Sequence, residues 1–263
     1  MSKEYFDINR RLWNQKTEIH LKSDFYEMDA FLNGKNTLKP IEMKLLGDIE
    51  GKSIRHLQCH FGQDSLSLSR LGAKVTGLDI SDKSIETARK LNHQLGLDAH
   101  FVCSDLYSAK EHINEKFDIV FTTYGTIGWL PDMDKWADVI SHFMKPNGKF
   151  IFVELHPLVW MYDDKFEQIM FSYFNKEAIV EVSPGTYANH AADIHMEEVG
   201  WNHPLSEVLT ALMSKNLKLM HFEEFNYSPH NCFKGMTEIT DGQYIIKSIG
   251  DKLPMTYSLV MKL

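Results

Sequence analysis

Short apolar runs alternate with amphipathic segments through the middle of the chain. The runs have the length of β-strands and cover residues 53–58, 74–79, 99–103, 117–123 and 149–154. The segments between them place apolar residues at helical spacing over residues 63–71, 82–95 and 133–144. The fourth run, FDIVFTT, is typical of a strand buried on both faces. This alternation predicts an α/β fold with a parallel sheet and helices on both faces.

Before this region, apolar residues follow a helical stripe that includes Tyr5, Ile8 and Leu12. We therefore predict an N-terminal helical cap over residues 1–50 and a main domain over residues 51–263.

After residue 154 the alternation stops. Two aromatic and polar excursions indicate insertions at about residues 157–200 and 226–254. The first insertion contains candidate strands at 166–174 and 177–182. The pattern closes with a helix at 204–215 and strands at 217–225 and 255–262.

Composition narrows the class of partner. A formal net charge of −8 and the lack of a basic run disfavour nucleic acid. Cys59, Cys103 and Cys232 are widely spaced, which suits a reduced compartment and offers no paired metal motif. The N-terminus is too polar for a signal peptide, and no 18-residue apolar run is present. We expect a cytoplasmic protein with no membrane partner.

The stretch over residues 53–81 reads as a strand, a tight turn, a helix and a second strand that ends at Asp79. Such a unit brings a carboxylate and helix N-terminal amides to one cleft, where a nucleoside-bearing cofactor binds. The turn holds one glycine, Gly62, so it is a weak match to the glycine-rich fingerprint. The alternative interpretation of Asp79 is a surface carboxylate that caps the next helix.

The order of the motifs resembles a class I S-adenosylmethionine-dependent methyltransferase over roughly residues 50–263. VTGLDIS is similar to the family's second motif, and Ser104-Asp105-Leu106 to its adenine segment. FDIVFTTYGTIGWL is similar to the fourth-strand motif, whose exit lines the methyl-transfer cleft, and KPNGKFIFVE to the fifth strand. The resemblance implies a Rossmann-like sheet of seven strands, mostly parallel, with the last strand antiparallel between the fifth and sixth.

The resemblance also implies S-adenosyl-L-methionine as cofactor and a set of residues that hold it. Asp79 takes the position that binds both ribose hydroxyls, and Asp105 the position beside the exocyclic amine of adenine. The implied cofactor-binding residues are Gln58, Cys59, His60, Gly62, Asp79, Ile80, Ser104, Asp105, Leu106 and Thr123.

The first motif departs from the family pattern. With Gly62 on the last glycine, His56 falls on the acidic position, Gln58 on the first glycine and His60 on the second. The second glycine normally lets the backbone approach the methionine part of the cofactor. The segment HLQCHFGQDSLSLSRLGA, with GWLPD, ELHP and WNHP, resembles an uncharacterised bacterial branch of the superfamily. We interpret the turn as a modified methionine-binding turn; a buried turn with His56 hydrogen-bonded in the core is compatible with this.

Methyl transfer is an in-line displacement at a sulfonium carbon, so the protein mainly aligns the acceptor and excludes water. Glu154 and His156 are candidate bases because they end the fifth strand. The structural alternative for His156 is a bond beside Pro157. Further candidates are His190, His195 and His203. His190 and His195 lie near Asp193 in the sequence and could be metal ligands. No third ligand is evident, and no metal is expected.

Five aromatic residues are candidates for an acceptor pocket or for a lid over the cofactor. The pocket candidates are Tyr124, Trp129 and Trp201, and the lid candidates are Trp13 and Tyr26. The alternative for both groups is ordinary packing of the insertions and of the N-terminal helices.

The sequence thus predicts methyl transfer to a small-molecule acceptor. A nicotinamide-dependent oxidoreductase is a rival interpretation, since Asp79 would also bind the ribose of a nicotinamide cofactor. It is disfavoured because the glycine-rich turn that binds a pyrophosphate is the part of the motif that this sequence matches least. A cofactor-binding regulatory protein that has kept the fold is the other rival. The acceptor, the base and the oligomeric state stay open.

Overall fold

The computed structural model describes residues 2–263 and contains a mixed sheet of seven strands in the order β3-β2-β1-β4-β5-β11-β8. Six strands share one direction: β1 (Ser53–Leu57), β2 (Lys74–Asp79), β3 (His100–Cys103), β4 (Phe117–Thr123), β5 (Met144–Leu155) and β8 (Lys218–Phe225). The seventh, β11 (Thr256–Lys262), is antiparallel to both of its neighbours, β5 and β8. The expected Rossmann-like sheet with an antiparallel last strand is therefore confirmed.

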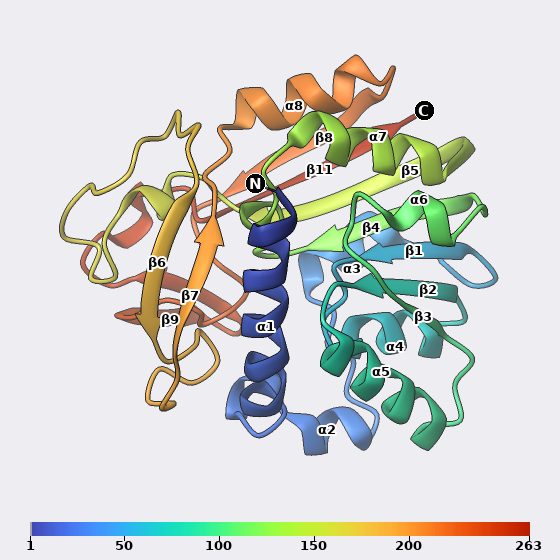
Figure 1. The fold of residues 1–263 in the computed structure, drawn as a ribbon, viewed down its shortest axis with the longest axis horizontal. Coiled ribbons are helices and arrows are strands. Elements are labelled where there is room, and N and C mark those ends of the chain that lie inside the picture. Colours follow the sequence, from blue (N-terminus) through green and yellow to red (C-terminus); the bar gives the residue numbers. More distant parts are fainter. Residues whose placement is uncertain (1) are drawn as a thin grey trace.

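Helices cover both faces of this sheet (Figure 1). The α-helices are α1 (Ser2–His20), α2 (Met28–Leu32), α3 (Pro40–Leu46), α4 (Gln63–Arg70), α5 (Asp82–Gln94), α6 (Ala109–His112), α7 (Met133–Phe143) and α8 (Leu205–Ser214). Short 3-10 turns lie at η1 (Asp24–Tyr26), η2 (Ile127–Trp129), η3 (Val159–Met161) and η4 (Gly250–Lys252). Side chains of α3, α4 and α5 pack in one apolar cluster, and those of α6, α7 and α8 in another.

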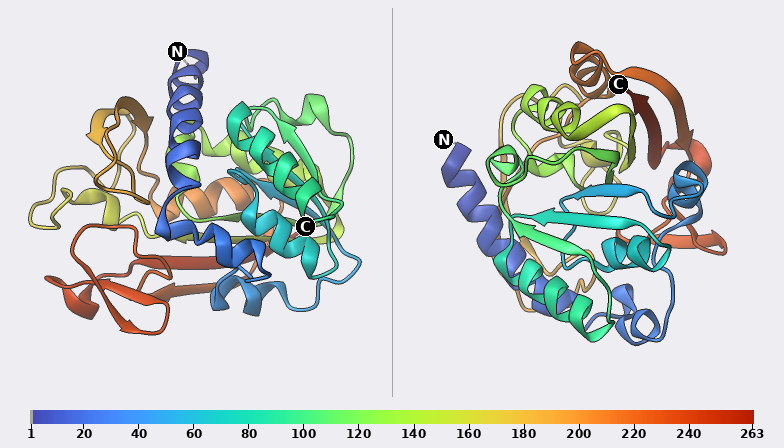
Figure 2. Two further views of the ribbon diagram at one scale, coloured as in Figure 1. Left: turned by 90° about the horizontal axis from the view of Figure 1, so that it is seen from below. Right: turned by 90° about the vertical axis from the view of Figure 1, so that its right-hand side faces the viewer.

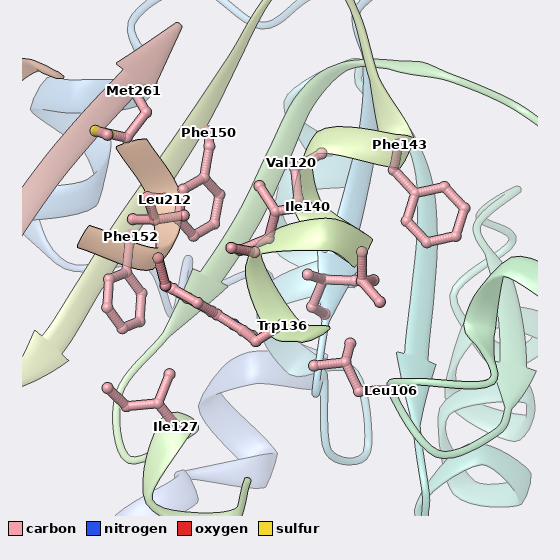
Figure 3. Close-up of a cluster of buried hydrophobic side chains, with 14 of the residues drawn as sticks. Leu106, Val120, Ile127, Trp136, Ile140, Phe143, Phe150, Phe152, Leu212 and Met261 are labelled. Atoms are coloured by element: carbon pink, nitrogen blue, oxygen red, sulfur yellow. The ribbon is translucent and has the colours of Figure 1, made fainter. Parts of the chain in front are cut away.

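The core under α7 shows why this segment is a helix. Its buried residues recur at helical spacing, and Trp136 is fully buried. Figure 3 shows the Trp136 ring beside Phe150 and Phe152 of β5, and the ring centroids are 5.6 and 5.4 Å from that of Trp136. Burying one large side chain of this kind contributes roughly 1.5–3 kcal/mol, so this cluster fixes α7 on the sheet.

Gly62 begins α4 for a steric reason. Its φ of 82° lies in the left-handed region, and a Cβ at this position would come within 2.8 Å of the Phe101 ring. The start of α5 is fixed differently, because the Ser81 hydroxyl accepts a hydrogen bond from the Ser84 amide at 3.0 Å. Both helices therefore begin directly after the strands β1 and β2, at the carboxyl edge of the sheet.

The N-terminal segment is not one continuous helix. The chain leaves α1 at His20 and turns through η1 and a left-handed residue, Glu27, into α2. In Figure 1, α1 stands between the carboxyl ends of the parallel strands and the hairpin formed by β6 (Ile179–Pro184) and β7 (His195–Gly200). The Asn9 side chain of α1 exchanges two hydrogen bonds with the Val199 backbone of β7, at 2.8 and 3.0 Å.

The insertions lie together on one side of the molecule, away from the helices α4 and α5 (Figures 1 and 2). The first insertion forms the β6–β7 hairpin, and the second forms β9 (Met236–Thr240) and β10 (Gln243–Ile246). The strand expected at residues 166–174 is wrong, because this segment makes only an isolated bridge through Ile169. The strand expected at 177–182 lies two residues later, as β6.

None of the helices in residues 2–263 combines the length and the apolar run that crossing a bilayer requires.

Candidate active site

A cavity of about 1070 Å³ lies over the carboxyl ends of β1, β2 and β4. Its walls come from the turn after β1, from α1 and the loop that follows, and from both insertions. A pocket for a single drug-sized ligand spans roughly 300–1,000 Å³. This cavity is therefore large enough for a cofactor and a second small molecule at the edge where ligands bind in such sheets.

The turn after β1 has a glycine-like backbone at two positions that are not glycine. Gln58 and His60 have φ values of 53° and 50°. These values lie in the left-handed region, which residues other than glycine seldom adopt. The turn is held by the His60 amide, which donates to Asp79 Oδ2 at 2.8 Å, and by the Cys59 amide, which donates to the Leu78 carbonyl at 2.8 Å. Each strained residue costs on the order of 1–3 kcal/mol, which indicates that the shape of this turn is used.

Asp79 ends β2 and lines the cavity with an exposed fraction of 8%. Its second oxygen, Oδ1, accepts a hydrogen bond from the Ser81 amide at 2.9 Å. Burial raises the pKa of this carboxyl to about 6, against the hydrogen bonds that lower it. Asp79 is thus a carboxylate at neutral pH, held in a fixed orientation at the floor of the cavity.

All of the implied cofactor-binding residues except Asp105 line the cavity. Nine of the implied residues line the cavity, namely Gln58, Cys59, His60, Gly62, Asp79, Ile80, Ser104, Leu106 and Thr123. Asp105 lies outside this lining, and its Oδ1 accepts a hydrogen bond from the Ser108 amide at 3.0 Å. The structure therefore places this carboxylate in a local turn after β3 rather than on the cavity wall.

Two histidines meet beside the first turn. His60 Nε2 lies 2.9 Å from Nδ1 of His20, which ends α1, and His60 Nδ1 lies 3.0 Å from the Ser84 hydroxyl. Burial lowers the pKa of His20 to about 3 and that of His60 well below its ordinary value, and the nearby Lys16 ammonium adds to both effects. Both rings are therefore neutral at physiological pH and tie α1 to the turn by hydrogen bonds.

The lid candidates both line the cavity. The Trp13 ring lies 5.1 Å from the His60 ring and 5.3 Å from the Trp129 ring, measured between centroids. The Tyr26 hydroxyl is hydrogen-bonded to the hydroxyl of Tyr187 from the first insertion. These contacts form a roof of aromatic side chains that joins the N-terminal segment to the insertion.

Lys16 is a functional candidate that sequence reasoning missed. Its ammonium lies 3.1 Å from Glu198 Oε2 of β7, and 5.2 and 5.0 Å from the ring centroids of Trp13 and Trp129. The signal was the phase of α1, in which Asn9, Lys16 and His20 share the buried stripe. Polar residues on such a stripe indicate partners inside the protein.

Glu154 lines the cavity, but donors from the loop after β4 and from its neighbour Leu155 occupy its carboxylate. Thr126 donates to it from its amide at 2.7 Å and from its hydroxyl at 2.9 Å, and the Leu155 and Ile127 amides donate at 2.7 and 3.3 Å. The Gly125 amide donates as well. Burial raises the pKa of Glu154, and the hydrogen bonds oppose this shift. This arrangement fits an anchor for the loop after β4 better than a base.

Two of the histidine candidates, His156 and His203, are also held by hydrogen bonds within the protein. His156 lies outside the cavity lining; its Nε2 is 3.0 Å from Glu224, and its Nδ1 accepts from the Leu158 amide at 3.2 Å. His203 lines the cavity, with Nε2 at 2.8 Å from the Leu130 carbonyl. No group of three His, Cys, Asp or Glu residues within residues 2–263 is placed to hold a metal ion.

The acceptor candidates Tyr124, Trp129 and Trp201 all line the cavity. Tyr124 follows β4 with a strained φ of 43°, and its hydroxyl donates to the buried Glu42 at 2.7 Å. Burial raises the pKa of Glu42 to about 7. The second insertion adds His230, whose ring lies 4.8 Å from that of Tyr124.

Comparisons with known proteins agree with this geometry. The family described as "Methyltransferase domain" matches residues 54–148. A ubiquinone biosynthesis O-methyltransferase of Coxiella burnetii is 22% identical over 182 residues, covering 68% of this chain and 74% of the relative. A protein of Haemophilus influenzae without an assigned function is 27% identical over 176 residues, covering 60% of this chain and 69% of that protein.

Solved structures share the fold. An S-adenosylmethionine-dependent methyltransferase from Mesorhizobium loti has a TM-score of 0.56 at 17% identity, covering 88% of this chain and 100% of that one. One from Clostridium acetobutylicum has a TM-score of 0.58 at 15% identity, covering 93% and 94%. The strand order and the cavity define a Rossmann-like methyltransferase fold. Residues 54–148 thus match a methyltransferase domain, and the chain is similar in sequence and in fold to S-adenosylmethionine-dependent methyltransferases.

Proposed function

We propose that the protein transfers a methyl group from S-adenosylmethionine to a small-molecule acceptor that enters between α1 and the insertions. The observation that carries this proposal is a continuous cavity that joins the first turn and Asp79 to the aromatic residues after β4. A cofactor and an acceptor in one cavity meet without intervening water, as an in-line displacement requires.

The residues of the cavity fit the cofactor from end to end. Ser104 and Leu106 beside β3 would flank adenine, and Asp79 would bind the ribose hydroxyls. The turn with Gln58 would face the methionine part. The Gln58 Oε1 atom is buried without a hydrogen-bond partner among the described residues, which suits an ammonium donor. When bound, S-adenosylmethionine supplies an electrophilic methyl group on a sulfonium.

The acceptor end of the cavity favours a planar, apolar molecule. Tyr124, Trp129 and Trp201 line it with their rings. Several of the curated relatives are named as O-methyltransferases of ubiquinone biosynthesis, which makes a phenolic acceptor the first class to test. We assign no base: the geometry leaves Glu154 and His156 with structural partners.

A cytoplasmic location and the exclusion of nucleic acid are part of this proposal. They rest on the three free cysteines and on the net charge of −8.

Calorimetric titration with S-adenosylhomocysteine tests the function. We expect saturable one-site binding, and a folded protein that shows none at high micromolar ligand would refute the proposal. Titration with NAD⁺ and NADP⁺ is the matched control, since binding of either in place of S-adenosylhomocysteine would favour the oxidoreductase. Binding without turnover on a panel of phenols and other metabolites would favour a regulatory protein instead.

A further inference from the structure

Lys16 is the one buried cation among the described residues that line the cavity. Its exposed fraction is 6%, whereas Lys35 and Lys234 of the same lining are exposed and Lys39 is partly exposed. A buried ammonium is costly unless a partner compensates it. Glu198 at 3.1 Å is the partner that the protein provides.

The position of this ammonium along the cofactor axis follows from the strand order. The sheet runs β3, β2, β1, β4, so adenine, ribose and methionine would lie over it in that sequence. Trp13 contacts the His60 ring after β1, Trp129 follows β4, and Lys16 lies over both indoles. The Lys16 charge therefore lies at the β1–β4 end of the cavity, where the amino-acid part of the cofactor would be.

Negative charge is in excess around Lys16. Glu198 is paired across the hairpin with Glu181, which also lines the cavity. The repulsion from Glu198 and Asp164 adds to burial in raising the pKa of Glu181. The Lys16 ammonium thus pairs with Glu198 in a region of excess negative charge, and a further anion that reaches it must share or replace Glu198.

We propose that Lys16 binds the α-carboxylate of the cofactor's methionine part and that Glu198 competes with this carboxylate for the ammonium. The inference rests on the proposed function, because it presupposes that S-adenosylmethionine occupies the cavity. No bond is made or broken: the ammonium exchanges one carboxylate partner for another. Since Glu198 lies on β7, cofactor binding would release one of the contacts that hold the hairpin to α1.

Two ligands separate this role from a general effect on the fold. S-adenosylhomocysteine carries the α-carboxylate, and 5′-methylthioadenosine shares its adenine, ribose and thioether but lacks the amino-acid part. We expect Lys16→Met to weaken S-adenosylhomocysteine binding at least about tenfold, as loss of a charge-assisted hydrogen bond implies. Binding of 5′-methylthioadenosine should stay within about twofold of wild type. Lys35→Met removes an exposed lysine of the same lining and is the matched control.

Glu198 supplies the second arm of the test. Glu198→Gln should tighten S-adenosylhomocysteine binding several-fold and leave 5′-methylthioadenosine unchanged. In the double variant the gain should vanish, because Glu198 acts only through Lys16. If Lys16→Met does not fold, Lys16→Arg keeps the charge and should retain most of the preference for the carboxylate-bearing ligand.

Equal losses for both ligands in Lys16→Met would show that Lys16 only supports the roof. Weaker or unchanged S-adenosylhomocysteine binding in Glu198→Gln would refute the competition. Failure of the proposed function gives a different result, since the wild-type protein would then bind neither ligand.

Discussion

The Asp79 carboxylate carries the ribose end of the proposed site. Its two oxygens accept hydrogen bonds from the amides of His60 and Ser81, and its side chain lines the cavity. We expect Asp79→Ala to weaken S-adenosylhomocysteine binding at least about tenfold, or ~1.4 kcal/mol, in a calorimetric titration. Asp105→Ala is the matched control, because Asp105 lies outside the lining and should change the affinity little. An unaltered affinity in Asp79→Ala would mean that the ribose lies elsewhere.

His56 makes stability depend on pH. It is buried, its Nδ1 lies 2.8 Å from the Ser65 hydroxyl, and burial, aided by the Arg55 charge, lowers its pKa to about 3 from 6.5. A lowered pKa in the folded state stabilises the fold above pH 6.5, and this contribution is lost as the pH falls from 6.5 toward 3. Between neutral pH and pH 5 the loss from this one group is about 2 kcal/mol.

The variant His56→Gln isolates this group from the other titrating residues. Its free energy of unfolding should fall less than that of the wild type between pH ~7.5 and pH ~5, by about 2 kcal/mol, in urea titrations. If both proteins lose the same amount, His56 is not neutral in the folded state.

The site residues that the sequence predicted lie in local apolar patterns, whereas those that it missed are placed by contacts between distant parts of the chain. Asp79 and Thr123 end predicted strands, so the strand pattern alone placed them at the cavity edge. Lys16 gains its role from Glu198, which is 182 residues away in the chain. His230 comes from an insertion whose path carries no periodic pattern. Contacts of this kind depend on tertiary packing and leave little trace in local sequence.

At the scale of elements, α1 is linked to the β6–β7 hairpin by polar contacts of two buried residues, Asn9 and Lys16. Asn9 is buried and provides a donor and an acceptor to the Val199 backbone. Asn9→Ala leaves both backbone groups unpaired, at about 1–3 kcal/mol each. We expect faster amide hydrogen exchange in residues 195–200, measured by mass spectrometry, and unchanged exchange in β1 and β4. Uniformly faster exchange across the sheet would contradict a local link.

The elements also show what apolar patterning can predict. The ranges expected for β2 and β4 agree with the structure to the residue, because these strands are apolar runs bounded by polar residues or turns. The segment at 166–174 has a similar composition, yet Phe166 packs in a separate apolar cluster while Ile169 and Phe174 are 63% and 69% exposed. Phe166 and Phe171 line the cavity, and the segment has no strand partner beyond the single bridge at Ile169, so composition alone was misleading.

At the scale of the whole molecule, cofactor binding should be coupled to global stability. The cavity is lined by residues of the sheet edge, the N-terminal segment and both insertions, so a ligand there would contact all three at once. At a free concentration of 100 times its Kd, S-adenosylhomocysteine should raise the free energy of unfolding by about 2.7 kcal/mol. In thermal denaturation this corresponds to a rise in Tm of roughly 5–10 °C. At the same ligand concentration Asp79→Ala should show a much smaller rise, and an equal rise would contradict the assigned site.

The place of β11 has a consequence for synthesis of the protein. This strand lies between β5 and β8, and its residues Tyr257, Leu259 and Met261 are fully buried in the main apolar cluster. The ribosome makes β5 and β8 first, but the two cannot join one sheet until residues 256–262 have left the exit tunnel. Until then the facing edges of β5 and β8 are unpaired, which is when a nascent chain is most exposed to aggregation. Folding of this sheet is therefore completed only after translation of β11, and chaperones that bind nascent chains should favour the yield of the protein.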